Sequence, residues 1–119
     1  MKQGYPTGQP CFLQRGKDCM EWQEAYRLVQ QGKACLLDIR SAQEYREQHI
    51  PESRHLNFFE ISSRTVAQVL PDRSLLVLVY CRSGLHSTTV ARQLNASGYR
   101  AIDMGAMSDW PWQLEGLWH

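Results

Sequence analysis

The stretch from residue 75 to residue 98 constrains the fold of this chain more than any other. It opens with an uninterrupted apolar run, Leu75 to Tyr80, that includes β-branched valines. Such a run is typical of a strand that is buried on both faces, as the strands of a parallel sheet are. A short polar loop follows, and then a helical pattern with three apolar residues on one face ends at Gly98. The stretch therefore predicts a strand, a loop and a helix, in that order.

Cys81 lies in the predicted loop between this strand and this helix. A strand–loop–helix turn brings backbone N–H groups together and directs the positive end of the helix toward them. A thiol at this point is stabilised as a thiolate and is a candidate nucleophile. The alternative is a buried cysteine that packs as a small apolar residue. The polar residues that follow at once favour the nucleophile.

The rest of the loop supplies candidate groups for binding an anion. Arg82 and His86 could place positive charge beside an anionic sulfur species, or could be a solvated charge and a residue at the start of the helix. Gly84 allows the loop to curl so that consecutive N–H groups face inward. The Ser87 hydroxyl could donate to an anion, but capping the helix is the role we favour. The predicted substrate-binding residues are Arg82, Ser83, Gly84, Leu85, His86 and Ser87.

Apolar runs and helical patterns alternate along the rest of the chain. Strands are predicted at residues 34–39, 56–58, 75–80 and 101–104. Helices are predicted at residues 18–32 and 41–48, each opened by a capping box, Asp18 with Glu21 and Ser41 with Glu44. A third helix is predicted at residues 61–70, and a fourth follows the cysteine loop. The apolar side of the third is expected to comprise Ile61, Thr65, Val69 and Leu70. This alternation is typical of an α/β sandwich with a mainly parallel sheet.

Two charged residues, Asp38 and Arg40, lie where the strand at residues 34–39 ends. The carboxyl ends of parallel strands meet at one edge of a sheet, so we expect these residues near Cys81. We interpret them as an ion-pair network with Glu44 or Glu47 that fixes the loop rather than as direct substrate contacts.

Length and composition limit the function classes. A chain of 119 residues is expected to form one domain with its own core. A formal net charge of +1 gives no strong field for nucleic acid or for an anionic membrane surface. The four cysteines and four histidines show no zinc-ligand spacing, and we interpret His49 and His55 as structural. The cysteines are expected to be cytosolic thiols, with a Cys11–Cys19 disulfide as the alternative.

The two ends of the chain differ from the middle. Residues 1–17 predict a loose arm, with a short extended piece at residues 11–14, and residues 18–119 form the predicted domain. The chain has no signal-peptide core and no apolar run long enough to span a membrane, so we expect a cytoplasmic protein. The C-terminal tail contains Trp110, Trp112 and Trp118, which are expected to cover the core or to line the mouth of the site.

Three groups of residues form an ordered pattern. The first comprises residues 36–40, 44–45 and 49–51, and the second is the segment from Val79 to Ser87. The third includes Gly98-Tyr99, Met104-Gly105 and Trp110. Together they resemble the rhodanese family of sulfurtransferases over nearly the whole chain, from residue 18 to residue 117.

The resemblance implies a three-layer sandwich whose five-stranded, mostly parallel sheet carries helices on both faces. It also implies a persulfide mechanism that needs neither a metal nor an organic cofactor. The Cys81 thiolate would attack the outer sulfur of a small anion such as thiosulfate and release sulfite. Cyanide, a thiol or a sulfur-relay protein would then accept the sulfur. No nucleic acid or membrane takes part in this mechanism.

This chain departs from the family pattern in the loop. The family often has Arg where this chain has His86. An imidazole, which is at most partly charged near neutral pH, holds a dianion less firmly than a guanidinium does. The physiological donor is therefore expected to be another persulfide or a partner protein. Glu52-Ser53 and Gly105-Ala106 replace the usual Gly-Ala and Gly-Gly.

Two other functions stay open. Phosphatases and arsenate reductases of the same fold use Cys-x5-Arg, in which the arginine grips the oxyanion with two hydrogen bonds. Here the sixth residue after Cys81 is Ser87, which disfavours that chemistry. The second alternative is a non-catalytic binding or regulatory domain. In such rhodanese domains the cysteine is commonly lost, and this chain keeps it.

Overall fold

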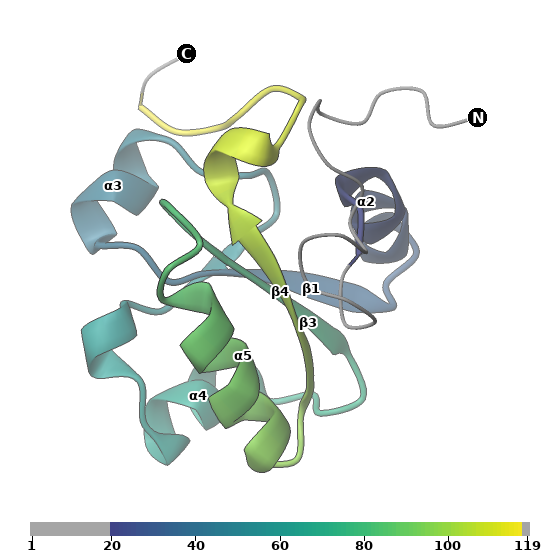
Figure 1. Cartoon of the computed structure of the whole chain (residues 1–119), viewed down its shortest axis with the longest axis vertical. Helices are drawn as coiled ribbons and strands as arrows, with labels where there is room; N and C mark the ends of the chain where they lie inside the picture. Colours follow the sequence, from purple (N-terminus) through teal and green to yellow (C-terminus); the bar gives the residue numbers. More distant parts are fainter. Residues whose placement is uncertain (1–19, 118–119) are drawn as a thin grey trace.

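The computed structural model of the chain describes residues 20–117, which fold into three layers (Figure 1). The central sheet has the strand order β2-β1-β3-β4, and every neighbouring pair is parallel. The strands are β1 (Ala34–Asp38), β2 (Arg54–His55), β3 (Leu76–Cys81) and β4 (Arg100–Ala106). The helices are α2 (Trp22–Gln30), α3 (Ala42–Glu47), α4 (Ser63–Val69) and α5 (Ser87–Ala96), with 3-10 helices η2 (Phe58–Glu60) and η3 (Met107–Asp109). The expected α/β sandwich with a parallel sheet is confirmed.

The two central strands carry the core on both faces. Every residue of β1 is buried, as is every residue of β3 after its first. Leu37 and Val79 belong to the cluster packed under α4 and α5, whereas Leu36 and Leu78 belong to the cluster under α2. Burial of each such side chain contributes roughly 1.5–3 kcal/mol to folding. The two apolar runs are therefore the buried strands that the sequence predicts.

The number of strands differs from the family-based expectation. The part of the chain that the structure describes contains a sheet of four strands rather than five. The extended piece expected at residues 11–14 and the predicted arm at residues 1–17 lie outside the described residues.

The strand predicted at residues 56–58 is wrong. Strand β2 ends at His55, and the next residues turn into η2. The Asn57 side chain accepts a hydrogen bond from the Phe59 N–H and starts this turn. A local side-chain bond therefore ends the strand early, which is typical of asparagine.

Two helices begin later than predicted. Helix α4 starts at Ser63 because Ser62 and Thr65 form a reciprocal capping box. Thr65 is thus part of the cap and not of the apolar side. Val66 and Leu70 are buried, and Ile61 and Val69 pack against the same cluster, so only Thr65 is wrong among the four apolar positions predicted. Helix α2 starts at Trp22 with Glu21 at its N-cap, so the start predicted at residue 18 is wrong, while Asp18 itself lies outside the described residues. The capping box at the start of α3 is confirmed.

The C-terminal segment folds back over α2. The Trp110 indole is buried and packs edge-on against Trp22, with ring centroids 5.5 Å apart. Trp112 is 40% exposed and lies 5.7 Å from Tyr26, while Trp118 lies outside the described residues. Covering of the core is confirmed for Trp110. Among residues 20–117, no helix has both the length and the apolarity needed to cross a membrane.

Candidate functional site

Cys81 is the last residue of β3 and pairs with Ala106 of β4, so it lies in the sheet and not in the loop. Its side chain packs in the apolar cluster under α5, and the residue is only 4% exposed. Cys81 therefore has features of both the nucleophile and the packing residue that the sequence left as alternatives. Cys81 is buried like a packing residue, yet it is also the first side chain below a polar loop.

The loop directs one backbone donor at the sulfur. The Gly84 N–H donates a hydrogen bond to Cys81 Sγ at 3.0 Å. Gly84 has a φ of +86°, which favours glycine, and a Cβ there would lie 3.4 Å from the Cα of Gly105. Helix α5 begins three residues later and points its positive end toward the same loop. This arrangement stabilises negative charge on the sulfur.

A pocket of about 270 Å³ opens above Cys81 at the carboxyl ends of β1 and β3. It is lined by the loop after β1, by the segment around η2 and by the cysteine loop. Its lining residues are Ile39, Arg40, Ser41, Glu44, Asn57, Phe58, Phe59, Cys81, Arg82, Ser83 and His86. The structure therefore brings together the two strand ends whose convergence the sequence predicts.

The charged residues of this edge form two separate pairs. Arg40 binds the buried Asp38 carboxylate with a contact of 2.7 Å and also donates to the Gln48 carbonyl. Burial alone would lower the pKa of Arg40, but the hydrogen bond and charge of Asp38 outweigh it and raise that pKa. This pair ties the end of β1 to the end of α3, as expected of an architectural ion pair.

Glu44, which lines the pocket, pairs with Arg82 of the cysteine loop. Its carboxylate lies 2.9 Å from the guanidinium of Arg82, whose side chain is 80% exposed. Burial would raise the pKa of Glu44, but hydrogen bonds from Ser41 and the charges of Arg82 and Arg40 lower it. Glu44 thus stays ionised. Its ion pair is with Arg82 of the cysteine loop, whereas the expected network joined Glu44 or Glu47 to Asp38 and Arg40.

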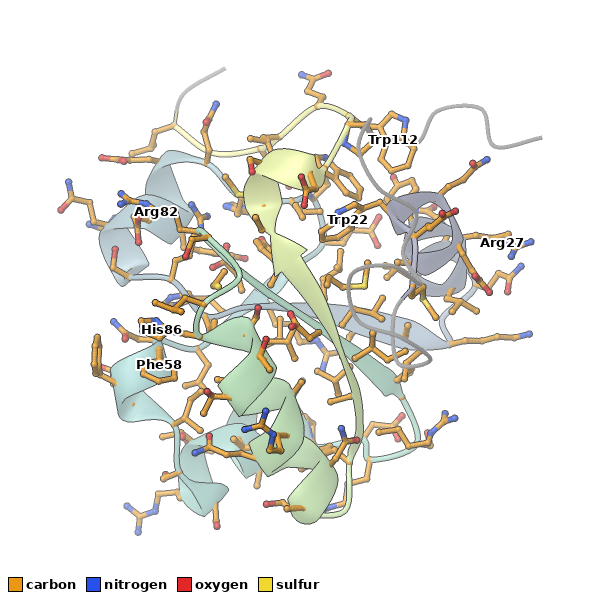
Figure 2. All side chains as sticks on the ribbon, viewed as in Figure 1. Trp22, Arg27, Phe58, Arg82, His86 and Trp112 are labelled. Carbon is orange, nitrogen blue, oxygen red and sulfur yellow. The ribbon has the colours of Figure 1, made fainter. Side chains whose placement is uncertain are left out.

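His86 lies against an aromatic wall (Figure 2). Its imidazole stacks face to face with the Phe58 ring, with centroids 4.0 Å apart and planes within 9°. The ring of Phe59 approaches the imidazole edge-on at 6.2 Å. Neither phenylalanine is predicted from the sequence to belong to the site. Their only signal was a pair of aromatic residues in an otherwise polar segment.

Ser87 does not cap α5, so the role favoured for it is wrong. It is the first residue of the helix, and His86 occupies the N-cap position. The Ser87 hydroxyl donates to Asp103 Oδ1 at 2.6 Å and approaches the Gly84 carbonyl at 3.2 Å. The buried Asp103 therefore uses this hydroxyl to hold the base of the loop.

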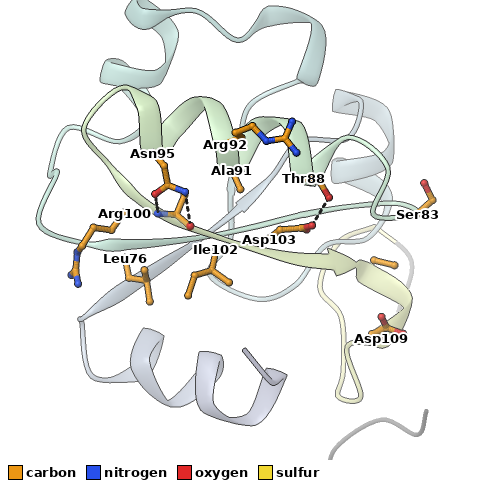
Figure 3. Close-up of a pocket in the computed structure, with 12 residues that line it drawn as sticks. Leu76, Ser83, Thr88, Ala91, Arg92, Asn95, Arg100, Ile102, Asp103 and Asp109 are labelled. Atoms are coloured by element: carbon orange, nitrogen blue, oxygen red, sulfur yellow. Dashed lines mark hydrogen bonds between the residues drawn. The ribbon is translucent and has the colours of Figure 1, made fainter. Parts of the chain in front are cut away.

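Asp103 was also missed from the sequence. Its carboxylate accepts a further hydrogen bond from the Thr88 hydroxyl at 2.5 Å (Figure 3) and another from the Gly105 N–H at 2.8 Å. The signal was a single carboxylate within a strand whose neighbours are apolar. Its partners could not be named because they lie on another element.

A second cavity, of about 940 Å³, runs along β4 and α5 (Figure 3). It is larger than the pocket above Cys81, but Cys81 does not line it. At its centre the Asn95 amide donates to the Ala101 carbonyl at 3.0 Å and accepts from the Ala101 N–H at 2.8 Å. The cavity is therefore a groove beside β4, the last strand in the order of the described residues, and we place the chemistry at Cys81.

The remaining predicted residues have structural surroundings. The Tyr45 ring lies between His49 and His55, at centroid distances of 4.0 and 4.8 Å. His55 Nε2 lies 2.7 Å from the Arg40 carbonyl oxygen. Within residues 20–117, no three His, Cys, Asp or Glu side chains are grouped so that they could hold a metal ion.

Comparison with known proteins agrees with this geometry. The family described as Rhodanese-like domain matches residues 21–110. Thiosulfate sulfurtransferase GlpE of Coxiella burnetii is 30% identical over 79 residues, which cover 66% of this chain and 71% of that protein.

Solved structures share the fold at lower identity. The BH2092 protein of Bacillus halodurans gives a TM-score of 0.69 at 20% identity, covering 79% of this chain and 73% of its own. A rhodanese with anions from E. coli gives 0.63 at 24% identity, covering 70% of this chain and 98% of its own. With its parallel sheet, its cysteine at the end of β3 and the match over residues 21–110, the chain belongs to the rhodanese-like domain family.

Proposed function

We propose that this protein is a sulfurtransferase in which Cys81 carries the transferred sulfur as a persulfide. The observation that carries the proposal is the contact between the Gly84 N–H and Cys81 Sγ at the floor of a pocket. A hydrogen-bond donor aimed at the sulfur favours the thiolate, which is the nucleophilic form. The curated relative named above is a thiosulfate sulfurtransferase.

The reaction proceeds in two displacements. The Cys81 thiolate attacks the outer sulfur of a donor such as thiosulfate. The bond between the two donor sulfurs breaks, sulfite leaves with its electron pair, and Cys81 holds a persulfide anion. A thiophilic acceptor, which is cyanide, a thiol or a cysteine of a relay protein, then takes the outer sulfur and restores the thiolate. No external oxidant or reductant is needed.

The loop residues have distinct roles in this proposal. Gly84 stabilises the sulfur anion through its N–H, and the Leu85 N–H donates to the Ser83 hydroxyl within the same turn. Arg82 and His86 line the approach to the sulfur. Ser87 acts from below, through Asp103, and does not face the substrate. Asp38, Arg40 and Glu44 support the opposite wall.

A non-catalytic binding domain is the alternative function. The burial of Cys81 favours this alternative, because buried cysteines often serve only packing. A phosphatase is less well supported because the Ser87 hydroxyl at the position of the anion-gripping arginine is bound to Asp103. We also propose a cytoplasmic location, where reduced thiols persist as acceptors.

Mass spectrometry of the intact protein tests the proposal. After incubation with thiosulfate, the wild-type protein should gain one sulfur atom and lose it on addition of cyanide. Cys81→Ser should gain none, whereas the matched variant Cys35→Ala should still gain one. Sulfur on the Cys81→Ser protein, or turnover by it, would contradict the mechanism. Absence of any adduct on the wild-type protein would favour the binding domain.

A further inference from the structure

We propose that the pocket above Cys81 selects sulfur donors that carry a single negative charge and an apolar arm, in preference to the thiosulfate dianion. The inference rests on the proposed function and concerns the donor class for the same site. Organic persulfides and thiosulfonates have this chemistry. Three features of the pocket carry the inference: its charge balance, its aromatic wall and its exposed apolar rim.

The charges that line the pocket compensate one another. Two guanidinium groups reach it, and each is paired with a carboxylate: Arg40 with Asp38 at 2.7 Å, and Arg82 with Glu44 at 2.9 Å. Glu44 itself lines the pocket, so an entering anion meets a carboxylate as well as the cysteine thiolate. Repulsion grows with each charge on the donor, and it is strong where water is partly excluded. The electrostatic repulsion of a dianionic donor in the pocket is therefore about twice that of a monoanionic donor.

One part of the pocket lining is aromatic. Phe58 and His86 form a face-to-face stack, and Phe59 adds its edge to the same wall. An aromatic or alkyl group can pack against these rings, whereas the sulfonate oxygens of thiosulfate cannot. The wall thus offers contact area to the part of a donor that thiosulfate lacks.

The rim of the pocket is apolar and exposed. Phe59, which lines the pocket, is 84% exposed, and Leu85, in the cysteine loop but outside the pocket lining, is 74% exposed. The pocket has a volume of about 270 Å³, which leaves room beside the reacting sulfur for an arm of several carbon atoms. A donor with such an arm removes both the arm and the Phe59 ring from water as it binds.

The chemical step remains balanced for this donor class. With a thiosulfonate, the Cys81 thiolate attacks the terminal sulfur, and the bond between that sulfur and the sulfonyl sulfur breaks. The sulfinate anion leaves with the electron pair, and Cys81 becomes a persulfide anion. With an organic persulfide, the corresponding thiolate leaves instead. Total charge and electron count are unchanged in both reactions.

Three donors separate charge from apolar contact: thiosulfate, methanethiosulfonate and benzenethiosulfonate. The first two differ by one charge, and the last two differ by a methyl against a phenyl arm. Single-turnover rate constants for persulfide formation on Cys81 are measured by mass spectrometry with each donor. Each is divided by the rate constant of the same donor with the amino acid cysteine, which removes differences in intrinsic reactivity. We expect the normalised constant to rise about tenfold at each step of the series.

Variants test whether Glu44 causes the effect of donor charge and whether Phe59 causes the effect of the apolar arm. Glu44→Gln keeps the capping box but removes the charge, so it should raise the thiosulfate constant about tenfold and change the thiosulfonate constants less. Glu47→Gln makes the same charge change on the same helix, outside the pocket lining, and should change none. Phe59→Ala should lower the constant for benzenethiosulfonate alone, with Leu117→Ala as the exposed apolar control outside the pocket lining.

The outcomes separate the two proposals. A normalised constant that is highest for thiosulfate, or a thiosulfate constant that Glu44→Gln leaves unchanged, would overturn the donor preference while the sulfurtransferase function stands. Absence of a Cys81 persulfide with all three donors would overturn the sulfurtransferase function, and the donor preference with it.

Discussion

The two cysteines of the described core differ in the surroundings of the sulfur atom. Cys81 Sγ accepts the Gly84 N–H at the floor of a pocket. Cys35 lies in the interior of the same apolar cluster, where burial raises its pKa despite the opposing charge of Arg54. The spacing of residues around Cys81 predicts its position at the strand end. The hydrogen bond to Gly84 needs the folded loop, so the sequence could not give its geometry.

This difference predicts unequal thiol reactivity. At neutral pH, iodoacetamide should modify Cys81 at least about tenfold faster than Cys35, because only the thiolate reacts. Since its pKa is raised, Cys35 should react appreciably only as the pH rises beyond the ordinary thiol value of about 8.5. Peptide mapping by mass spectrometry across a pH series measures both rates. Equal rates at neutral pH would contradict the prediction.

Gly84 offers a test of the loop conformation. Gly84→Ala places a Cβ at a positive φ, which strains the backbone, and in van der Waals contact with Gly105, so we expect the loop to relax and the N–H to move away from the sulfur. We expect about 1 kcal/mol of destabilisation from the backbone alone and a loss of persulfide formation of at least about tenfold.

Gly32→Ala is the matched control for that variant. Gly32 also has a positive φ, of +75°, but its added Cβ would meet no atom within 4 Å. Its unfolding free energy should fall by a similar amount while persulfide formation stays at the wild-type rate. If both variants lost the reaction equally, the effect would be one of stability and not of loop geometry.

Among the secondary-structure elements, the contact between β4 and α5 holds the base of the site. Asp103 accepts hydrogen bonds from Ser87 and Thr88 of α5 and from Gly105, where the pairing of β4 with β3 shifts register. The sequence predicts both elements from their apolar patterns. It does not predict this contact, because the sequence around a carboxylate in a strand does not indicate which residues of another element will bind it.

Asp103→Asn therefore tests a positioning role for this residue. We expect a loss of about 1–3 kcal/mol of stability and a lower rate constant for persulfide formation, because Ser87 no longer has a charged acceptor. Ser87→Ala should have a similar effect on the rate, and the double variant should be no slower than either single one.

Thr88→Val is the control for that pair, since it removes one hydrogen bond to the same carboxylate on the side away from the loop. It should lower stability but leave the rate constant near the wild-type value. Additive rate effects of the Asp103 and Ser87 variants would show that the two residues do not act together.

The sequence predicts whole helices and strands better than it predicts where they begin and end. Strands β1 and β3 and helix α5 were predicted because their apolar patterns are long and regular. The ends of β2 and α4 were not, because single side chains, Asn57 and Ser62, decide them through local hydrogen bonds. Such bonds compete closely with continued strand or helix.

For the whole molecule, the C-terminal segment closes the face of the sheet that α2 covers. Trp110 packs on Trp22 and Tyr26, and the Glu115 backbone pairs with that of His49. Trp110→Ala should lower the free energy of unfolding by about 3 kcal/mol, because it leaves a cavity in the core. Chemical denaturation measures this, with Leu117→Ala, which is exposed, as the control with little expected change. A loss below about 1 kcal/mol for Trp110→Ala would show that the segment is dispensable for the fold.

The bond between Asn95 and the backbone of Ala101 has a consequence for encounters between copies of the protein. Ala101 belongs to β4, which lies at the end of the strand order, and the Asn95 amide satisfies both its N–H and its carbonyl. An amide side chain presents the same donor and acceptor that a neighbouring strand would. Within the part of the chain that the structure describes, a further strand beside β4 would therefore find the N–H and carbonyl of Ala101 already hydrogen-bonded.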